Sequence, residues 1–367
     1  MIITRTPYRI SFFGGGTDYQ EWYREFGGAV LATTINKYCY ITTRYLPPFF
    51  EHRFRIVYSK IEQCENIDDI VHPAVREVLR YLDWNRGIEI HHDGDLPARS
   101  GMGSSSSFTV GLLNAVYALR GYLPSKHQLA RESIYIEHDR LKEAVGSQDQ
   151  VMAAYGGLNL VTFETSGAVN VGTIPILRDR LNTLNDHLML FYTGIKRTAS
   201  TVAETYNIKQ KEKQLHAMKE MVQEGLSIIN STGDLNQFGR LLNEAWQIKC
   251  SLSSKVSNSH VQDLYDTAIR AGALGGKLLG AGGGGFMLLF AHPSNHQKIR
   301  EKLSGLLCVP FKFEHGGSQV IFCDRDAEDY ADLDSQRKNI VLKPFQELLS
   351  MPKETDPARS GDALKSV

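Results

Sequence analysis

The sequence has 367 residues, of which 42% are hydrophobic and 22% charged, as in a globular protein long enough for two or three domains. Lysine plus arginine and aspartate plus glutamate number 41 each, so the net charge gives no reason to expect nucleic acid or an anionic membrane as a partner. No apolar run approaches the roughly 18 residues of a membrane span, and Arg5 and Arg9 interrupt the N-terminal stretch that a signal peptide would need, which together predict a cytoplasmic protein.

The number and spacing of the cysteines also predict a cytoplasmic protein. Their number is odd, and no two of them have the C-x-x-C spacing. Reduced thiols are therefore expected, rather than disulfides or a zinc site. The five positions are Cys39, Cys64, Cys250, Cys308 and Cys323.

Hydrophobic periodicity predicts mixed strands and helices in the first half of the chain. Short strands punctuated by glycines come first, and helices dominate after residue 100. In chain order the expected elements are strands over 9–13, 28–35 and 38–46, a helix after Pro73, a strand over 88–92, helices near 104–120, 125–139 and 147–154, and a strand over 156–163.

A new block of elements begins near residue 187. The expected elements there are a strand over 187–194, two helices within 198–247, a helix over 259–272, a helix over 294–306, and strands over 309–314 and 318–323. Strands and helices do not alternate regularly, which predicts an α+β fold rather than a doubly wound sheet. We therefore expect one domain over 1–185, a second over 186–350, and a loose polar tail over 351–367.

The stretch "LPARSGMGSSSSF" (96–108) lies between a predicted strand and the first turn of a predicted helix. A glycine- and serine-rich run can be a flexible linker, but a linker has no place between two such elements. Backbone N–H groups at a helix start bind phosphate, and only small residues allow close approach. The chain contains no G-x-x-x-x-G-K-[ST] motif, so a Walker-type site is excluded.

Two more glycine stretches occur at the ends of predicted strands. "FFGGGTDY" (12–19) ends in an acid, and "KLLGAGGGGFMLLF" (277–290) lies between two apolar strands. Tight turns also require glycine, which is the structural alternative for each stretch.

The three stretches, in this order and spacing, resemble the three motifs of the GHMP kinase superfamily, and the resemblance covers about residues 1–330. It implies an N-terminal ATP-binding domain of βαβ type, a C-terminal ferredoxin-like domain, and ATP and Mg²⁺ as cofactors. ATP and a small-molecule substrate would meet between the domains, without a nucleic acid or membrane partner. Residues expected to contact ATP are Pro97, Arg99, Gly101, Met102, Gly103, Ser104, Ser105 and Ser106. Glycines expected to contact substrate are Gly14, Gly15, Gly16, Gly282, Gly283 and Gly284, together with Thr17.

The resemblance also assigns roles to acids and one arginine. Glu137, with Ser105, matches the magnesium site, and Asp149 in "GSQDQ" matches the acid that acts on the substrate hydroxyl. Arg9 matches the motif-one cation near the transferred phosphate, where a permanent positive charge would offset developing negative charge. From the residues alone, Glu137 could also be an exposed helix acid, and Arg9 could equally be a surface residue on an edge strand.

Motif one carries information about the substrate. Asp18 matches an aspartate that accepts hydrogen bonds from sugar hydroxyls, whereas Gly15 and Gly16 replace the glutamate and its neighbour in galactokinase-like motifs. The sequence therefore resembles the branch that phosphorylates an anomeric hydroxyl, which includes kinases of D-glycero-D-manno-heptose 7-phosphate and of fucose. A phosphorylated substrate would need further cations. The candidates, each of which could also be a solvated surface charge, are Arg99, Lys196, Arg197 and Lys249.

The expected function is thus ATP-dependent phosphorylation of the anomeric hydroxyl of heptose 7-phosphate, giving the 1,7-bisphosphate for cell-surface polysaccharide or nucleotide-heptose synthesis. Other sugar kinases, of fucose, galactose or mannose type, remain alternatives. So do an ATP-dependent decarboxylase and a non-catalytic sensor of ATP and sugar. The presence of Asp18 and Tyr19 in motif one counts against the decarboxylase.

Overall fold

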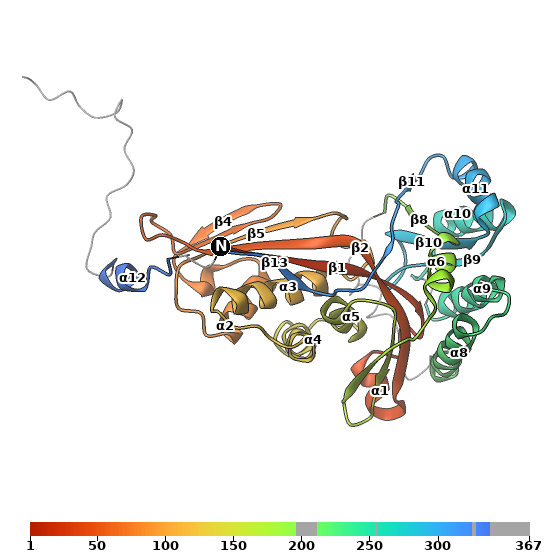
Figure 1. Ribbon diagram of the computed structural model, residues 1–367, viewed down its shortest axis with the longest axis horizontal. Coiled ribbons are helices and arrows are strands. Elements are labelled where there is room, and N and C mark those ends of the chain that lie inside the picture. The colour runs from red at the N-terminus through yellow and green to blue at the C-terminus, as the bar shows by residue number, and fades with distance from the viewer. Residues whose placement is uncertain (196–210, 254, 325–327, 338–367) are drawn as a thin grey trace, which may run out of the picture.

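The computed structural model describes residues 1–195, 211–253, 255–324 and 328–337, and its strands form two separate sheets (Figure 1). The larger sheet has nine strands, with the main order β13-β1-β2-β5-β3-β4. β12 and β6 pair with β2, and β7 pairs with β6. The strand bounds are β1 Ile2–Phe13, β2 Gly28–Tyr45, β3 Phe54–Val57, β4 Ile61–Cys64, β5 Ile88–Gly94, β6 Asn159–Phe163, β7 Val169–Thr173, β12 Phe313–Glu314 and β13 Gln319–Cys323.

The prediction of several short strands in the first 60 residues is wrong, because 28–35 and 38–46 belong to one long strand, β2. Asn36 and Lys37 have the polarity of a turn, but the register jumps there: Pro7 pairs with Tyr38 and Tyr8 with Ile35. The two residues thus form a bulge within a continuous strand pair.

Helices cover one side of this sheet (Figure 1). The helix expected after Pro73 is α2, Pro73–Tyr81. The side chain of His72 caps its start, and Pro73 occupies its first turn. The helix predicted near 104–120 is α3, Ser104–Leu119, and most of its residues are buried. The helix predicted over 125–139 ends at Tyr135 and continues as a π-helical turn, Ile136–Arg140. The helix bounds in this part are α1 Gln20–Phe26, α2 Pro73–Tyr81, α3 Ser104–Leu119, α4 Lys126–Tyr135, α5 Gln148–Tyr155 and α6 Arg178–Asp186.

The second sheet has four antiparallel strands in the order β11-β8-β10-β9. Along the chain these are the fourth, first, third and second strands of a β-α-β-β-α-β pattern, which is the ferredoxin-like arrangement. Their bounds are β8 Leu188–Tyr192, β9 Ala273–Leu278, β10 Phe286–Ala291 and β11 Leu307–Cys308. The accompanying helices are α8 Glu212–Asn230, α9 Asn236–Cys250, α10 Ser259–Arg270 and α11 His296–Lys302, and a short helix α12, Ala331–Arg337, ends the described chain.

The strands predicted over 309–314 and 318–323 are shorter, and they return to the first sheet. β12 pairs with β2, and β13 lies antiparallel to β1 at the edge of the sheet. The chain thus leaves the first sheet, builds the second, and comes back. The division of the chain near residue 185 stays a prediction, and the tail over 351–367 lies outside the described residues.

The two sheets meet where β1 ends. Phe12 and Phe13 pack edge-to-face against Phe238 of α9, with ring centroids 5.3 and 5.1 Å apart. The ammonium of Lys277 in β9 donates to the carbonyl of Phe12 at 2.9 Å. The first glycine stretch begins directly after this junction, so packing between the sheets fixes its position.

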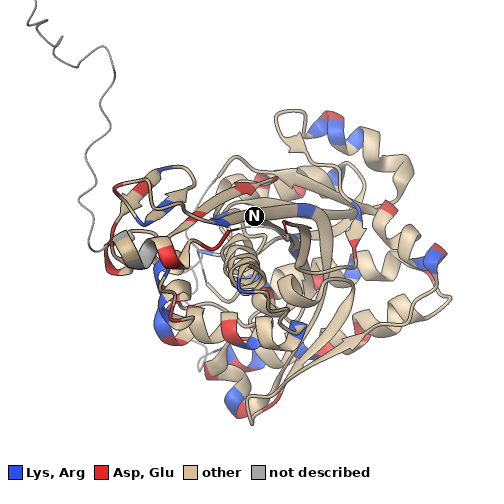
Figure 2. Ribbon diagram, turned by 60° about the vertical axis from the view of Figure 1, so that its left-hand side comes forward, with Lys and Arg blue, Asp and Glu red and all other residues tan. Residues whose placement is uncertain are grey.

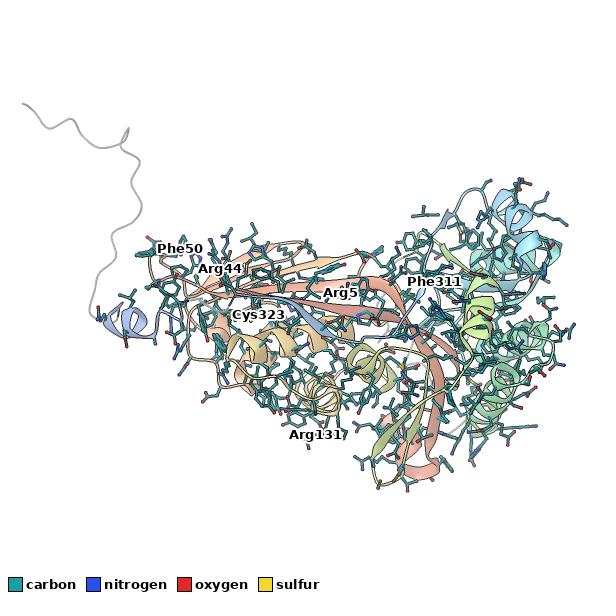
Figure 3. The ribbon with its side chains drawn as sticks, viewed as in Figure 1. Arg5, Arg44, Phe50, Arg131, Phe311 and Cys323 are labelled. Carbon is teal, nitrogen blue, oxygen red and sulfur yellow. The ribbon has the colours of Figure 1, made fainter. Side chains whose placement is uncertain are left out.

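Charged residues of both signs occur throughout the described chain. Lys and Arg are interspersed with Asp and Glu along the ribbon (Figure 2). Within the described residues, no helix combines the length and apolarity needed to cross a membrane. The five cysteines are free thiols; Cys39 is buried, and Cys323 is exposed on β13 (Figure 3).

Candidate active site

The serine-rich stretch is a tight turn between β5 and α3, not a loose linker. Gly101 and Gly103 have φ angles of +81° and +73°, a region that glycine adopts without strain. The Ser100 hydroxyl donates to the carbonyl of Pro97 at 2.6 Å, and the backbone N–H of Arg99 donates to the Ser104 hydroxyl at 3.2 Å. The first turn of α3, with its free backbone N–H groups, therefore opens directly from this turn.

Arg9 and Asp149 form a bidentate ion pair directly beneath this turn. Nε and Nη2 of Arg9 donate to the two carboxylate oxygens of Asp149 at 2.7 and 2.8 Å, and Nη1 donates to the carbonyl of Gly101 at 2.7 Å. Arg9 is only 4% exposed, on a strand between β13 and β2, so it is not a surface residue on an edge strand. A Cβ at Gly103 would lie 3.3 Å from both Arg9 Cγ and an Asp149 oxygen. Any side chain there would crowd the pair.

Asp18 is a buried carboxylate beside this pair, in which Asp149 is partly exposed. The backbone N–H groups of Gly16 and Gln148 donate to its two oxygens at 2.8 and 3.2 Å. Burial raises the pKa of Asp18, and the charge of Asp149 raises it further, while these hydrogen bonds oppose the shift. Gly146 packs so closely that a Cβ there would clash with the Asp18 carboxylate. The motif-one residue Asp18 and the segment 146–149 therefore pack directly against each other.

Glu137 lies on the π-helical turn after α4 and is fully buried, which rules out an exposed helix acid. One carboxylate oxygen accepts from the Ser106 hydroxyl at 2.8 Å and from the Gln150 amide at 2.5 Å. The other oxygen has no partner among the described residues. Burial, with repulsion from Glu143, raises the pKa of Glu137 to about 8.

A magnesium ion fits this carboxylate, because an unpartnered buried oxygen is the ligand type that Mg²⁺ prefers. The described residues contain no cluster of three or more side chains that could hold a metal alone. Mg²⁺ in proteins is usually held by one or two carboxylates together with substrate phosphates. The Ser106 hydroxyl, expected at a phosphate, contacts Glu137, whereas Ser105 is exposed and its metal role stays a prediction.

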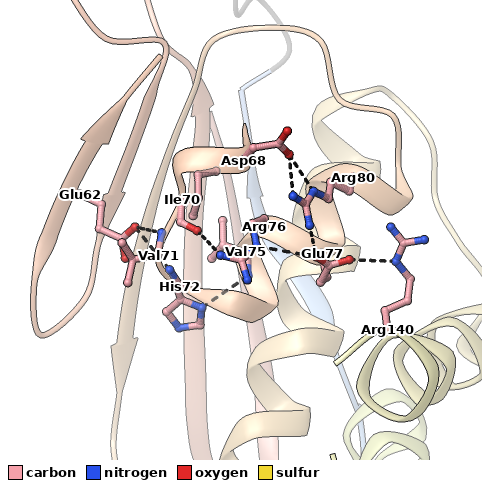
Figure 4. A network of polar contacts seen from close by, with 10 residues as sticks. All are labelled: Glu62, Asp68, Ile70, Val71, His72, Val75, Arg76, Glu77, Arg80 and Arg140. Carbon is pink, nitrogen blue, oxygen red and sulfur yellow. Dashed lines mark hydrogen bonds and ion pairs between the residues drawn. The ribbon is translucent and has the colours of Figure 1, made fainter. Parts of the chain in front are cut away.

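A polar network holds the π-helical turn in place (Figure 4). Nε of Arg140, the last residue of the turn, donates to Glu77 of α2 at 3.0 Å, and Arg80 binds the other oxygen of Glu77 at 2.5 Å. Arg80 also binds Asp68 through Nε and Nη2. Through this chain of ion pairs, α2 fixes the segment that carries Glu137.

Two buried lysines from the second half of the chain complete the polar cluster. Lys249 of α9 donates to the carbonyls of Leu278 and Gly280 at 3.0 and 2.5 Å, so it is not a solvated cation. Burial, and then repulsion from Arg9, lowers the pKa of Lys249 to about 8. The pKa of Lys277 lies well below its usual value, through burial and the charges of Lys249 and Arg9. Sequence reasoning missed Lys277, although a lysine within the apolar run "GGKLLG" was a usable signal.

The other candidates fall into three groups. Thr17 donates to the carbonyls of Gly14 and Ala29 and so shapes the motif-one turn. Arg99 is exposed at a φ of +59°. Lys196 and Arg197 lie outside the described residues. The substrate roles of all site residues stay predictions.

Gly282 and Gly284 of the third stretch face protein atoms. A Cβ at Gly282 would lie 2.6 Å from the carbonyl oxygen of Val256, and one at Gly284 would lie 2.6 Å from the Ile195 side chain. Between them, the N–H of Gly283 donates to the Val256 carbonyl at 2.7 Å. This loop is therefore packed against Val256 and Ile195.

Comparison with known proteins agrees with this arrangement. The profile of the GHMP kinases N terminal domain matches residues 69–157, and that of the GHMP kinases C terminal matches residues 217–307. D-glycero-alpha-D-manno-heptose 7-phosphate kinase of Campylobacter jejuni is 28% identical over 314 residues, which cover 82% of this chain and 93% of that protein. Galactokinase of Thermococcus kodakarensis is 25% identical, with 83% of this chain and 94% of that protein covered.

A solved structure has the same overall fold. It is that of a D-glycero-D-manno-heptose 1-phosphate kinase from Bacteroides thetaiotaomicron, with a TM-score of 0.73 and 22% identity. The match covers 88% of this chain and all of the other. The two profiles, the two-sheet α+β architecture and the three glycine loops agree with one another. The chain therefore belongs to the GHMP kinases and is a phosphotransferase.

Proposed function

We propose that this protein uses ATP and Mg²⁺ to phosphorylate the anomeric hydroxyl of a sugar phosphate, with D-glycero-D-manno-heptose 7-phosphate as the acceptor. The observation that carries the proposal is the Arg9–Asp149 pair beneath Gly103, at the start of α3 and beside Asp18. The carboxylate of Asp149 and the fixed charge of Arg9 therefore lie next to the start of α3, where the phosphates of ATP would bind. The similarity to the heptose 7-phosphate kinase suggests the acceptor.

Each residue of the pair has a defined task. Arg9 occupies one lone-pair direction on each Asp149 oxygen, which leaves others free to accept a proton from an acceptor hydroxyl. Asp149 orients that hydroxyl and takes its proton as general base, and the loose transition state of phosphoryl transfer demands little more than positioning and charge. The Arg9 guanidinium stabilises negative charge that develops at the transferred group.

The remaining contacts supply binding. The turn 97–106 holds the ATP phosphates on the N–H groups at the start of α3. Glu137, with the Ser106 hydroxyl, holds Mg²⁺, which would neutralise charge on the phosphates when bound. Asp18 accepts hydrogen bonds from the sugar, and the Lys249 ammonium favours an acceptor that carries a negative charge of its own.

The test is an acceptor screen with purified protein, ATP and MgCl₂. Heptose 7-phosphate, fucose, galactose and mannose are each supplied, and ADP release and the phosphorus NMR spectrum of the product are followed. We expect the heptose 1,7-bisphosphate as the preferred product. Transfer to a neutral sugar alone would move the proposal to another acceptor. Mevalonate diphosphate is tested in addition, and carbon dioxide release from it would indicate a decarboxylase. If no ADP is released with any of these compounds, the proposal is refuted and a non-catalytic sensor is indicated.

A further inference from the structure

Two buried side chains beside the Arg9–Asp149 pair keep polar atoms without partners. Ser11 of β1 is 5% exposed and Gln148, the first residue of α5, is 7% exposed. The Ser11 hydroxyl and the Gln148 side-chain oxygen have no hydrogen-bond partner among the described residues. Such atoms are expensive to bury, so native proteins almost always pair them with protein, water or ligand.

Both side chains border the same small space, above Gly15. A Cβ placed on Gly15 would lie 3.5 Å from the Ser11 hydroxyl and 3.6 Å from the Gln148 amide nitrogen, which is ordinary contact, and nothing else lies within 4 Å. The φ of Gly15 is not in the left-handed region. Neither backbone conformation nor packing therefore requires glycine here. Gly14 differs, because it has a φ of +81° and its Cβ would clash with the Ala29 carbonyl.

The space adjoins the residues of the proposed reaction. Ser11 lies two positions after Arg9 in a regular part of β1, so the two side chains leave the same face of the strand. Gln148 directly precedes Asp149, and its backbone N–H donates to Asp18. A sugar whose anomeric hydroxyl lies at Asp149 would thus carry its neighbouring hydroxyl towards Ser11 and Gln148.

We propose that Ser11 and Gln148 are specificity-determining residues that bind the acceptor hydroxyl next to the phosphorylated one, in the space that Gly15 leaves open. The proposal rests on the proposed function. A sugar hydroxyl both donates and accepts, so it can pair with the Ser11 hydroxyl and with the Gln148 amide in either orientation of that amide. Gly15 is required because any side chain would fill the place of that hydroxyl.

The experiment compares Ser11→Ala, Gly15→Ala and a matched control, Thr43→Val. Thr43 also has a buried hydroxyl without a partner, but it pairs with Ile90 and lies nine residues along β2 from Thr34, the partner of Arg9. Kinetics with heptose 7-phosphate give the KM values of acceptor and ATP and kcat, and thermal melting reports folding.

We expect Ser11→Ala to raise the acceptor KM about tenfold, the value of one hydrogen bond, with the KM of ATP and the Tm unchanged. Gly15→Ala should raise the acceptor KM by at least as much without loss of Tm, because its Cβ meets only ordinary contacts. With the 2-deoxy analogue of heptose 7-phosphate, which lacks the hydroxyl in question, Ser11→Ala should have no further effect. Thr43→Val should match the wild type in every measurement.

The proposal is overturned if Gly15→Ala leaves the acceptor KM unchanged, or if Ser11→Ala affects the deoxy analogue as strongly as the parent sugar. Calorimetric titration of heptose 7-phosphate without ATP separates this inference from the proposed function. A wild-type protein that binds the sugar but transfers no phosphate refutes the function alone, and Gly15→Ala must still weaken binding. Equal binding by wild type and Gly15→Ala, or no binding by either, refutes the inference.

Discussion

The turn 97–103 has two glycines and the loop 279–285 has five, and the two stretches face different surroundings. Gly103 lies next to the Arg9–Asp149 pair, and any side chain at this position would crowd the groups proposed to react. In the later loop, a Cβ on Gly280 would lie 2.6 Å from the Cα of Gly101, and one on Gly282 would lie 2.6 Å from a carbonyl oxygen of Val256. Gly103 thus leaves room beside the groups proposed to react, whereas Gly101, Gly280 and Gly282 let backbone pack on backbone.

The comparison also shows how the two loops depend on each other. Because Gly101 and Gly280 touch, the later loop supports the turn that borders the site. Lys249 stabilises the beginning of the later loop, because its ammonium donates to the carbonyls of Leu278 and Gly280. Substitutions in the first region should therefore affect turnover, and those in the second should affect stability.

The largest effect is expected for Asp149→Asn, at the centre of the first region. Asparagine keeps the shape and one acceptor but removes the base, so kcat should fall about 10²- to 10⁴-fold. Calorimetric titration should find ATP and acceptor binding within a few-fold of wild type. Retention of more than about a tenth of the wild-type turnover would exclude Asp149 as general base.

A pair of alanine substitutions tests the contrast between the loops directly. Gly282→Ala combines a φ of +113° with a clash against Val256, so it should cost about 1–3 kcal/mol in the free energy of unfolding. Gly103→Ala, at a φ of +73°, should also lose some stability, but it should differ from Gly282→Ala by raising the KM of ATP. Urea unfolding and steady-state kinetics of both variants provide the measurement. A higher acceptor KM in Gly282→Ala at unchanged stability would instead support the substrate role that motif three predicts for this loop.

The smallest effect concerns the pH dependence of stability through Lys249. Its pKa in the folded protein is about 8, below the ordinary 10.5, so between these values the unfolded chain binds more protons and the lysine makes stability rise with pH. Replacement by methionine should remove about 1 kcal/mol per pH unit from that rise. Urea unfolding between pH 7 and pH 10 checks it. Lys126→Met is the matched control, because Lys126 also donates to a backbone carbonyl but is exposed.

Local patterns in the sequence were sufficient for most elements and for the outline of the site. The helix over 104–119 follows from its apolar spacing, and α2 from His72 and Pro73 at its start. The three glycine stretches could be recognised because each is a short contiguous run, and the candidate roles of Arg9, Glu137 and Asp149 followed from the family resemblance that these stretches carry. The α+β class followed from the order of elements, which is also a property of the chain alone.

Contacts between distant segments were decided only by the tertiary structure. The sequence does not show that β13 returns to β1, that Ser106 rather than Ser105 contacts Glu137, or that Lys277 reaches the carbonyl of Phe12. Each depends on residues 31 to 321 positions apart, whose approach is set by the packing of whole elements. No motif assigns a role to Ser11 or Gln148, although both lie next to motif residues. Their importance comes from being buried without partners on either side of Gly15, and burial exists only once the two segments have come together.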